Sequence, residues 1–110
     1  MLDKYGLMKL LSTSGKYRGF NYLLDGLNLA AQNDDLIHPL KHKLYPILAE
    51  KYGTNVSCVE RNIRTLITIW WNNGKKDPLK AKFDKDLGVP SNKEFIYQLV
   101  AQLQRNKIGN

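Results

Sequence analysis

The sequence has only one cysteine and no long uninterrupted run of apolar residues. A single cysteine, Cys58, excludes a disulfide within the chain, and the lack of about 18 consecutive apolar residues argues against a membrane-spanning helix. A secretory signal pattern, a glycine-rich phosphate loop and a nucleophile elbow are also missing. We therefore expect a protein of the reducing cytoplasm that is not an enzyme, has no membrane association and uses no cofactor.

Acidic residues are scarce as well. The 110 residues include 10 Asp and Glu against 17 Lys and Arg, so the net charge is +7. Such a balance favours a polyanionic partner, usually nucleic acid. The excess of positive charge is densest in residues 56–76, which contain four basic residues and one acidic residue. The hydrophobic content of 43% suits a single folded domain over residues 1–110.

A predicted helix pair in residues 44–73 organises the rest of the chain. The first helix covers residues 44–52, and Gly53 follows where a left-handed residue would end it. Thr54 or Asn55 then caps a second helix, because either side chain can accept a bond from a free amide. This second helix should extend from about Val56 to Asn73.

The second helix of the pair has two distinct faces. Spacings of three and four place one set of apolar residues on the core face, namely Val56, Val59, Ile63, Leu66, Ile67 and Trp70. The opposite face carries Ser57, Glu60, Arg61, Arg64 and Thr68. A short helix, a glycine-containing turn and an arginine-bearing second helix are typical of a helix-turn-helix that enters the DNA major groove. An ordinary helical corner with solvated arginines gives the same pattern.

The remaining segments also have helical spacing. Short helices are predicted around residues 5–11 and 79–87, and a longer one over residues 20–31. Pro39 and Pro46 imply either two short helices or one kinked helix in the segment that leads into the central pair. Asp34 or Asp35 would cap the start of this segment. Ser91 and Glu94 form a capping box that opens a last helix. The sequence thus predicts an all-α domain of about six helices with a central helix-turn-helix.

Several short motifs follow one another in a fixed order. They are Leu44-Tyr45-Pro46 with Ala49, then Val59-Glu60-Arg61 with Ile63-Arg64, then Trp71 and Gly74, then Pro90, Asn92, Glu94, Phe95 and Ile96. With these motifs, nearly the whole chain resembles the C-terminal DNA-binding effector domain of the master sporulation response regulator of endospore-forming Firmicutes, the stage-zero sporulation transcription factor. The resemblance implies a six-helix domain that binds a short promoter element.

The resemblance also implies site residues and points to departures. Glu60, Arg61 and Arg64 fall where the family's recognition helix touches DNA, whereas Cys58 and Asn73 stand where the family commonly has arginine. The phosphoryl-accepting receiver domain of the family is absent, so we expect either an excised fragment or a stand-alone protein. Tandem docking on DNA through the last helix is a hypothesis, with Tyr97 or Phe95 as its exposed contact.

The predicted DNA-binding set combines the outward helix face with the loop that follows it: Ser57, Cys58, Glu60, Arg61, Arg64, Thr68, Lys75 and Lys76. The lysines of residues 80–85 would add weaker, salt-dependent contacts with the DNA backbone. His38 and His42 have the i, i+4 spacing of a metal pair, but a third ligand is missing, so no metal is expected. Of Trp70 and Trp71, one should lie in the core and the other should be partly exposed.

Two other functions remain open. The fold could serve as a protein-interaction module that acts on RNA polymerase or on a full-length regulator, and Cys58 and Asn73 favour that reading. The charge of +7 also suits a nonspecific nucleoid binder.

Overall fold

The computed structural model describes the backbone of residues 1–75 and 77–109, and the side chains of residues 1–75 and 77–105. Its five α-helices are α1 (Lys4–Leu11), α2 (Arg18–Gln32), α3 (Leu44–Lys51), α4 (Val56–Trp71) and α5 (Asn92–Gly109). Four short 3₁₀ helices join them, η1 (Asp34–Ile37), η2 (Leu40–His42), η3 (Lys80–Lys82) and η4 (Lys85–Leu87). The described ranges contain no strand, which confirms the predicted all-α class.

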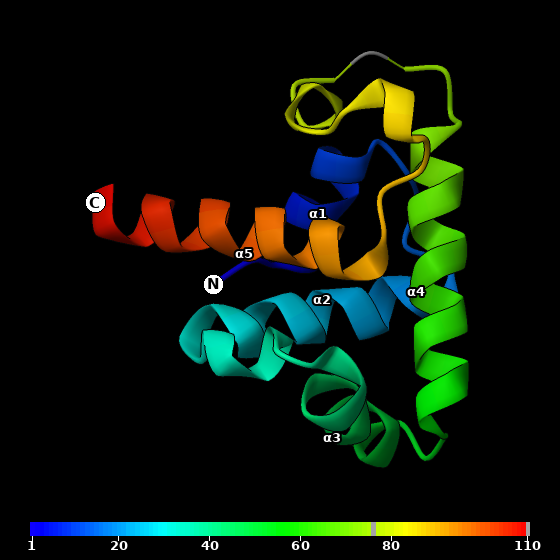
Figure 1. Ribbon diagram of the computed structural model, residues 1–110, viewed down its shortest axis with the longest axis vertical. Coiled ribbons are helices and arrows are strands. Elements are labelled where there is room, and N and C mark those ends of the chain that lie inside the picture. The colour runs from blue at the N-terminus through cyan, green and yellow to red at the C-terminus, as the bar shows by residue number, and fades with distance from the viewer. Residues whose placement is uncertain (76, 110) are drawn as a thin grey trace.

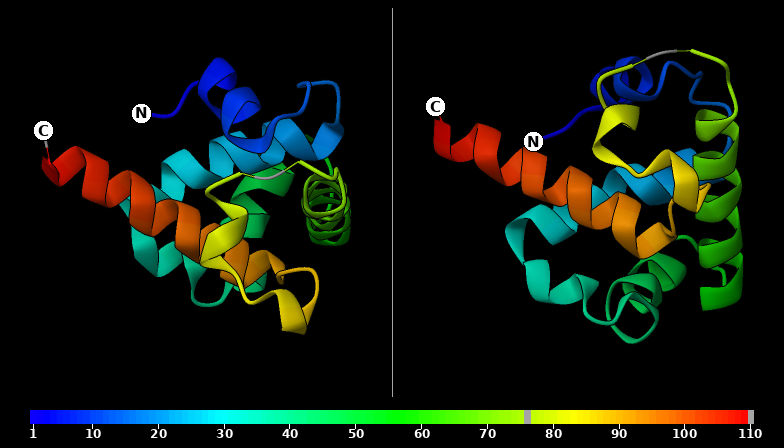
Figure 2. Two further views of the ribbon diagram at one scale, coloured as in Figure 1. Left: turned by 90° about the horizontal axis from the view of Figure 1, so that it is seen from above. Right: turned by 45° about the horizontal axis from the view of Figure 1, so that its top comes forward.

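Helix α4 stands along one side of the molecule, and α2 and α5 run from it toward the opposite side (Figure 1; Figure 2 shows the same arrangement from above). Helix α3 lies beside the amino-terminal part of α4. The closest helix crossing is between α2 and α4, because a Cβ atom on Gly19 would lie 2.1 Å from the carbonyl oxygen of Asn62. Only glycine permits that approach without a backbone shift.

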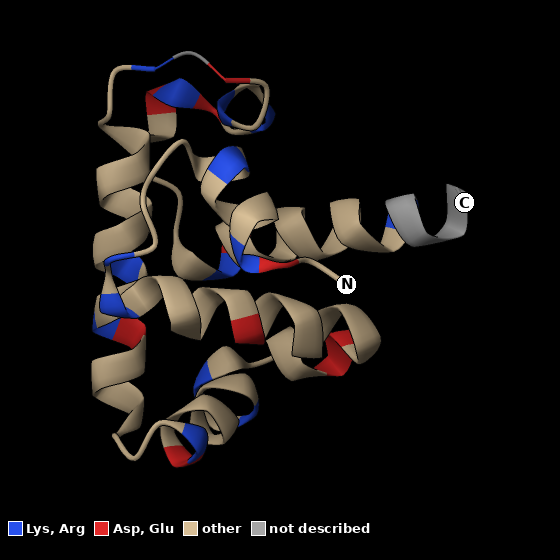
Figure 3. Cartoon of the chain, turned by 180° about the vertical axis from the view of Figure 1, so that it is seen from behind, with Lys and Arg blue, Asp and Glu red and all other residues tan. Residues whose placement is uncertain are grey.

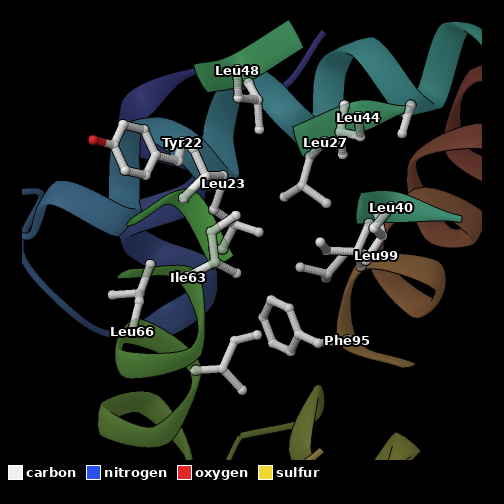
Figure 4. Close-up of a cluster of buried hydrophobic side chains, with 14 of the residues drawn as sticks. Tyr22, Leu23, Leu27, Leu40, Leu44, Leu48, Ile63, Leu66, Phe95 and Leu99 are labelled. Atoms are coloured by element: carbon white, nitrogen blue, oxygen red, sulfur yellow. The ribbon is translucent and has the colours of Figure 1, made fainter. Parts of the chain in front are cut away.

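All five α-helices contribute side chains to the hydrophobic core, and the core side chains drawn in Figure 4 point toward one another. Trp70 is fully buried, with its ring centroid 5.0 Å from that of Phe95, whereas Trp71 is only partly buried. This division between the two tryptophans was predicted. Every residue of the predicted core face of α4 is buried except Val56, which is partly exposed at the start of the helix.

Helix boundaries follow the predicted capping residues in most places. Gly53 has a left-handed φ of +63° after α3, and the Asn55 side chain caps α4. Ser91 and Glu94 form the capping box of α5, in which the Ser91 hydroxyl accepts a 3.1 Å bond from the Glu94 amide. The cap of η1 is Asn33 rather than the predicted Asp34 or Asp35, because Asn33 accepts a bond from the Asp35 amide.

The segment in which a short α-helix was predicted, residues 79–87, forms η3 and η4 instead. Phe83 is extended (φ −117°, ψ 149°) and separates the two turns. Leu79 is buried, but Leu87 is 76% exposed, so the apolar residues of this segment do not share one buried face. The helical spacing of these apolar residues did not predict that they differ in burial. Across the described residues, none of the helices is long and apolar enough to cross a bilayer.

Candidate nucleic-acid interface

The turn between α3 and α4 is held by bonds of its own backbone and of one side chain. The amide of Thr54 donates to the carbonyl of Ala49 (2.9 Å), which closes the end of α3. The side-chain oxygen of Asn55 accepts from the amide of Cys58 (2.8 Å), which opens α4. The turn therefore fixes the angle between the two helices of the helix-turn-helix.

A second set of contacts fixes α4 against the rest of the domain. Asn92 at the start of α5 is only 8% exposed, and its side-chain amide donates to the Tyr45 hydroxyl and to the Glu60 carbonyl, each at 3.1 Å. This single side chain joins α3, α4 and α5. Together with the crossing at Gly19, it holds α4 so that its other side faces solvent.

The solvent-facing side of α4 carries Ser57, Arg61 and Arg64, all exposed, with Glu60 partly exposed beside them. The Arg64 guanidinium lies 3.1 Å from the Glu60 carboxylate, and the two residues are one helical turn apart. Among the ion pairs of the described residues, none involves Arg61. Basic positions gather at the middle of α4 and on the ribbon beside it (Figure 3). The predicted face thus presents two guanidinium groups, of which that of Arg64 is paired and that of Arg61 takes part in no ion pair among the described residues.

Cys58 lies at the edge of this face rather than in its centre. It is partly buried, and the side-chain amide of Asn62 lies 3.3 Å from its sulfur. A hydrogen bond with the Thr54 side chain is the largest cause that lowers the pKa of the Cys58 thiol below its ordinary value. Tyr22 and Arg18 of α2 lower the pKa further. Cys58 therefore faces the start of α2.

Thr68 and the lysines after α4 differ from the central residues in their surroundings. The Thr68 hydroxyl donates to the carbonyl of Arg64 (2.9 Å) and is partly buried. Lys75 is exposed, with its ammonium 3.5 Å from the carbonyl oxygen of Ser12. The predicted contact at Lys76 lies outside the described residues. The ammonium of Lys80 donates to Asn73 (2.6 Å) and to the Lys75 carbonyl (2.7 Å), so it is engaged inside the domain.

The expectation of an exposed Phe95 was wrong. Phe95 is fully buried against Trp70, because it lies on the side of α5 that faces the core. Tyr97, two residues later, is 52% exposed. His38 and His42 are both exposed, and within the described residues no group of three or more His, Cys, Asp or Glu side chains is placed to hold a metal ion.

Residues at the start of α2 were not predicted as part of the site. Arg18 and Asn21 are exposed there and line a hollow of about 340 Å³ together with the turn after α3. The sequence did contain a signal, since Arg18 is a basic residue two positions before the helix predicted over residues 20–31. Periodicity could not reveal that this end lies beside Cys58, because the crossing of α2 and α4 depends on tertiary packing.

The fold and this geometry agree with a comparison of the sequence with known protein families. The family model described as the C-terminal domain of the sporulation initiation factor Spo0A matches residues 5–103. Because the match covers most of the chain, the protein belongs to this family, as its sequence motifs predicted. The family is a DNA-binding effector domain of a sporulation response regulator and is not a family of enzymes.

Proposed function

We propose that this protein is a sequence-specific transcription regulator that inserts α4 into the major groove of double-stranded DNA. The observation that carries the proposal is the solvent-facing side of α4, where Arg61 lies exposed on a helix that Gly19 and Asn92 hold in place. A rigid helix whose guanidinium is in no ion pair with another described residue can present a planar pair of donors to guanine. On this proposal the protein works in the cytoplasm, on promoter DNA.

The residues of the site would have different roles. Arg61 is the proposed base reader, because its guanidinium is not used in an ion pair of the described residues. Glu60 orients Arg64 through their 3.1 Å contact and can accept a bond from cytosine N4. Ser57 lies near the amino end of α4, where hydroxyls commonly meet phosphate. Cys58 and Thr68 flank these residues, and Lys75 and Lys76 would supply salt-dependent backbone contacts.

The experiment begins with selection of bound sequences from a pool of random duplexes. Affinity for the selected duplex and for a scrambled one is then measured with the wild type and with Arg61→Ala. We expect the wild type to prefer the selected duplex by about a hundredfold or more. Arg61→Ala should lose about 1 to 3 kcal/mol of discrimination at one base pair. Arg105→Ala, at the far end of α5, is the control for loss of one charge and should retain the preference.

Other outcomes would contradict the proposal in different ways. Equal, steeply salt-dependent binding of the wild type to both duplexes would indicate a nonspecific nucleoid binder driven by the charge of +7. An unchanged preference in Arg61→Ala would remove Arg61 from base reading. No binding to any duplex would leave the protein-interaction alternative.

One observation favours that alternative as a second candidate function. Leu87 and Val89, in the connection between α4 and α5, are 76% and 40% exposed, and exposed apolar side chains close in sequence suit a protein partner. RNA polymerase or a full-length regulator would be such a partner. Leu87→Ser with Val89→Ser should then abolish partner binding in a pull-down with purified RNA polymerase while DNA binding stays unchanged.

Tandem binding on DNA belongs to the same proposal. Two domains on adjacent half-sites bind better than one, because the first raises the effective concentration of the second. Tyr97 is the proposed contact, since it is half exposed on α5. Cooperativity on a duplex with two half-sites should fall in Tyr97→Ala and affinity for a single half-site should not. Cooperativity that survives this substitution would rule out Tyr97 as the contact.

A further inference from the structure

The hollow at the start of α2 has walls from two parts of the chain. Arg18, Asn21 and Tyr22 come from the first turns of α2, and Tyr52, Gly53 and Thr54 come from the end of α3 and the turn before α4. Its volume is about 340 Å³. The walls are brought together by the crossing of α2 and α4 at Gly19 and by the edge-to-face contact of Tyr22 with Tyr52, whose ring centroids are 5.0 Å apart.

The polar groups that line the hollow are mostly hydrogen-bond donors. Arg18 contributes a guanidinium with five N–H groups, and Asn21 and Thr54 contribute an amide and a hydroxyl. None of the ion pairs between described residues uses Arg18. The nearest acidic side chain of α2 in sequence, Asp25, already accepts bonds from Lys51 and Tyr52. The lining therefore suits an anion rich in acceptor oxygens, such as a phosphate.

The position of the hollow relates it to the open side of α4. Thr54, which lines the hollow, lies two residues before the start of α4, and Gly19, which follows Arg18, packs against Asn62 of α4. The hollow therefore borders the start of α4, the helix that carries Arg61. In a helix-turn-helix complex, the recognition helix reads base edges while the first helix of the pair crosses the sugar-phosphate backbone, and the end of that first helix, α3, forms one wall of the hollow.

We propose that this hollow binds one backbone phosphate of the duplex that α4 reads, with the Arg18 guanidinium as the principal donor. The inference rests on the proposed function, because it requires that α4 is bound in the major groove of the duplex. Asn21 supplies a further donor to the same phosphate. The contact fixes the register of α4 on the duplex and carries no base information of its own.

The first test compares Arg18→Gln with the matched control Arg105→Gln, which removes the same charge at the far end of α5. Affinity for the selected duplex and for its scrambled version is measured across a salt series. Each phosphate contact contributes roughly 0.9 to the slope of log affinity against log salt. We expect Arg18→Gln to reduce the slope by about 1 and to weaken both duplexes by the same factor, roughly tenfold at moderate salt. Arg105→Gln should leave the slope unchanged.

A second arm identifies the phosphate. Duplexes that each carry one uncharged methylphosphonate are bound by the wild type and by Arg18→Gln. A methylphosphonate at one position should weaken DNA binding by the wild type but not by Arg18→Gln, because this variant has already lost the phosphate contact. Arg18→Lys keeps the charge and should retain the salt slope with weaker affinity, since it lacks the guanidinium fork. Unchanged circular dichroism spectra and melting temperatures establish that the variants are folded.

The outcomes separate this inference from the proposed function. If the wild type prefers the selected duplex but Arg18→Gln matches Arg105→Gln in slope and affinity, the phosphate contact is wrong and the function stands. If the wild type binds no duplex, the proposed function fails first. Inorganic phosphate provides the last arm: saturable amide shifts around Arg18 in NMR, together with no sensitive methylphosphonate position, would assign the hollow to free phosphate and overturn the DNA contact.

Discussion

The unit formed by α2, α3 and α4 (residues 18–71) and the connection between α4 and α5 (residues 72–91) are stabilised in different ways. In the unit, apolar faces are buried and two helix backbones touch at Gly19, so position is set by packing. In the connection, Leu79 and Pro90 are buried, whereas most of the other described residues are exposed or partly exposed. Position there depends on Phe83, which packs against Trp70 and Phe95, and on a few polar side chains.

These polar contacts are specific, although they are few. The two carboxylate oxygens of Asp77 accept from the Trp70 indole N–H (3.2 Å) and from the Lys80 amide (2.9 Å). The Lys80 ammonium also lies 5.7 Å from the centroid of the Trp70 ring. The two regions therefore have different roles. The packed unit presents the candidate site, and the connection needs only enough contacts to close the core over Trp70.

The largest expected effect comes from the crossing inside the packed unit. Gly19→Ala places a methyl group 2.1 Å from the carbonyl oxygen of Asn62, and a backbone atom cannot move aside as a side chain does. We expect a loss of about 3 kcal/mol or more in the free energy of unfolding, at the upper end for overpacked sites. Urea unfolding followed by circular dichroism measures it. DNA binding should weaken as well, because α4 moves relative to α2.

Gly15→Ala is the matched control for this substitution. There the new methyl group would lie 2.9 Å from Cε of Lys4, the end of a flexible side chain that can swing away. We expect a change of less than about 1 kcal/mol in the free energy of unfolding. Equal losses in the two variants would mean that the crossing is not tight, and that the packed unit is no more constrained than its surroundings.

A smaller effect is expected in the connection, where two aspartates have the same local role. Asp77 and Asp84 each accept a bond from an amide two or three residues later, but only Asp77 also contacts the core through Trp70. Asp77→Ala should reduce the free energy of unfolding by about 1 to 2 kcal/mol, because the indole N–H loses its partner. Asp84→Ala should cost within about 0.5 kcal/mol. Thermal unfolding of both variants, with Trp fluorescence as the probe, makes the comparison.

The contrast between the two regions also explains how far the sequence could predict the fold. In the packed unit, periodicity predicted α2 and α4 to within a few residues, because each helix buries one continuous apolar face. In residues 79–87 the same reasoning predicted a helix, yet η3 and η4 formed. Three apolar residues at helical spacing are too few to bury a face, and Leu87 stays in solvent. Local capping by Asp84 then decides the conformation.

The candidate site was predictable only where it lies on one helix. Ser57, Glu60, Arg61 and Arg64 share a face of α4 by their spacing alone, and the structure places them together. Arg18 comes from 40 residues earlier and reaches Cys58 only through tertiary packing. Either Tyr97 or Phe95 was expected to be the exposed contact of α5, and the structure buries Phe95 and leaves Tyr97 exposed. A site that combines side chains from two elements therefore cannot be predicted without the structure, whereas a site on one amphipathic helix can be predicted from the sequence.

The smallest expected effect concerns the chemistry that the packed unit imposes on Cys58. Its thiol pKa is lowered chiefly by a hydrogen bond with Thr54, so the thiolate fraction at a given pH exceeds that of an ordinary cysteine. The rate of alkylation by iodoacetamide should rise with pH and reach half its plateau below the ordinary thiol pKa. Thr54→Val removes the hydroxyl and should shift this midpoint upward.

Thr65→Val is the control, because the Thr65 hydroxyl donates to the Arg61 carbonyl and is not among the groups that shift the pKa of the Cys58 thiol. Arg18→Gln should also shift the midpoint upward, because Arg18 lowers the pKa of the thiol as well. Identical pH profiles in wild type and Thr54→Val would mean that the turn before α4 is looser in solution than its bonds suggest, and the difference between the packed unit and the connection would then be one of burial alone.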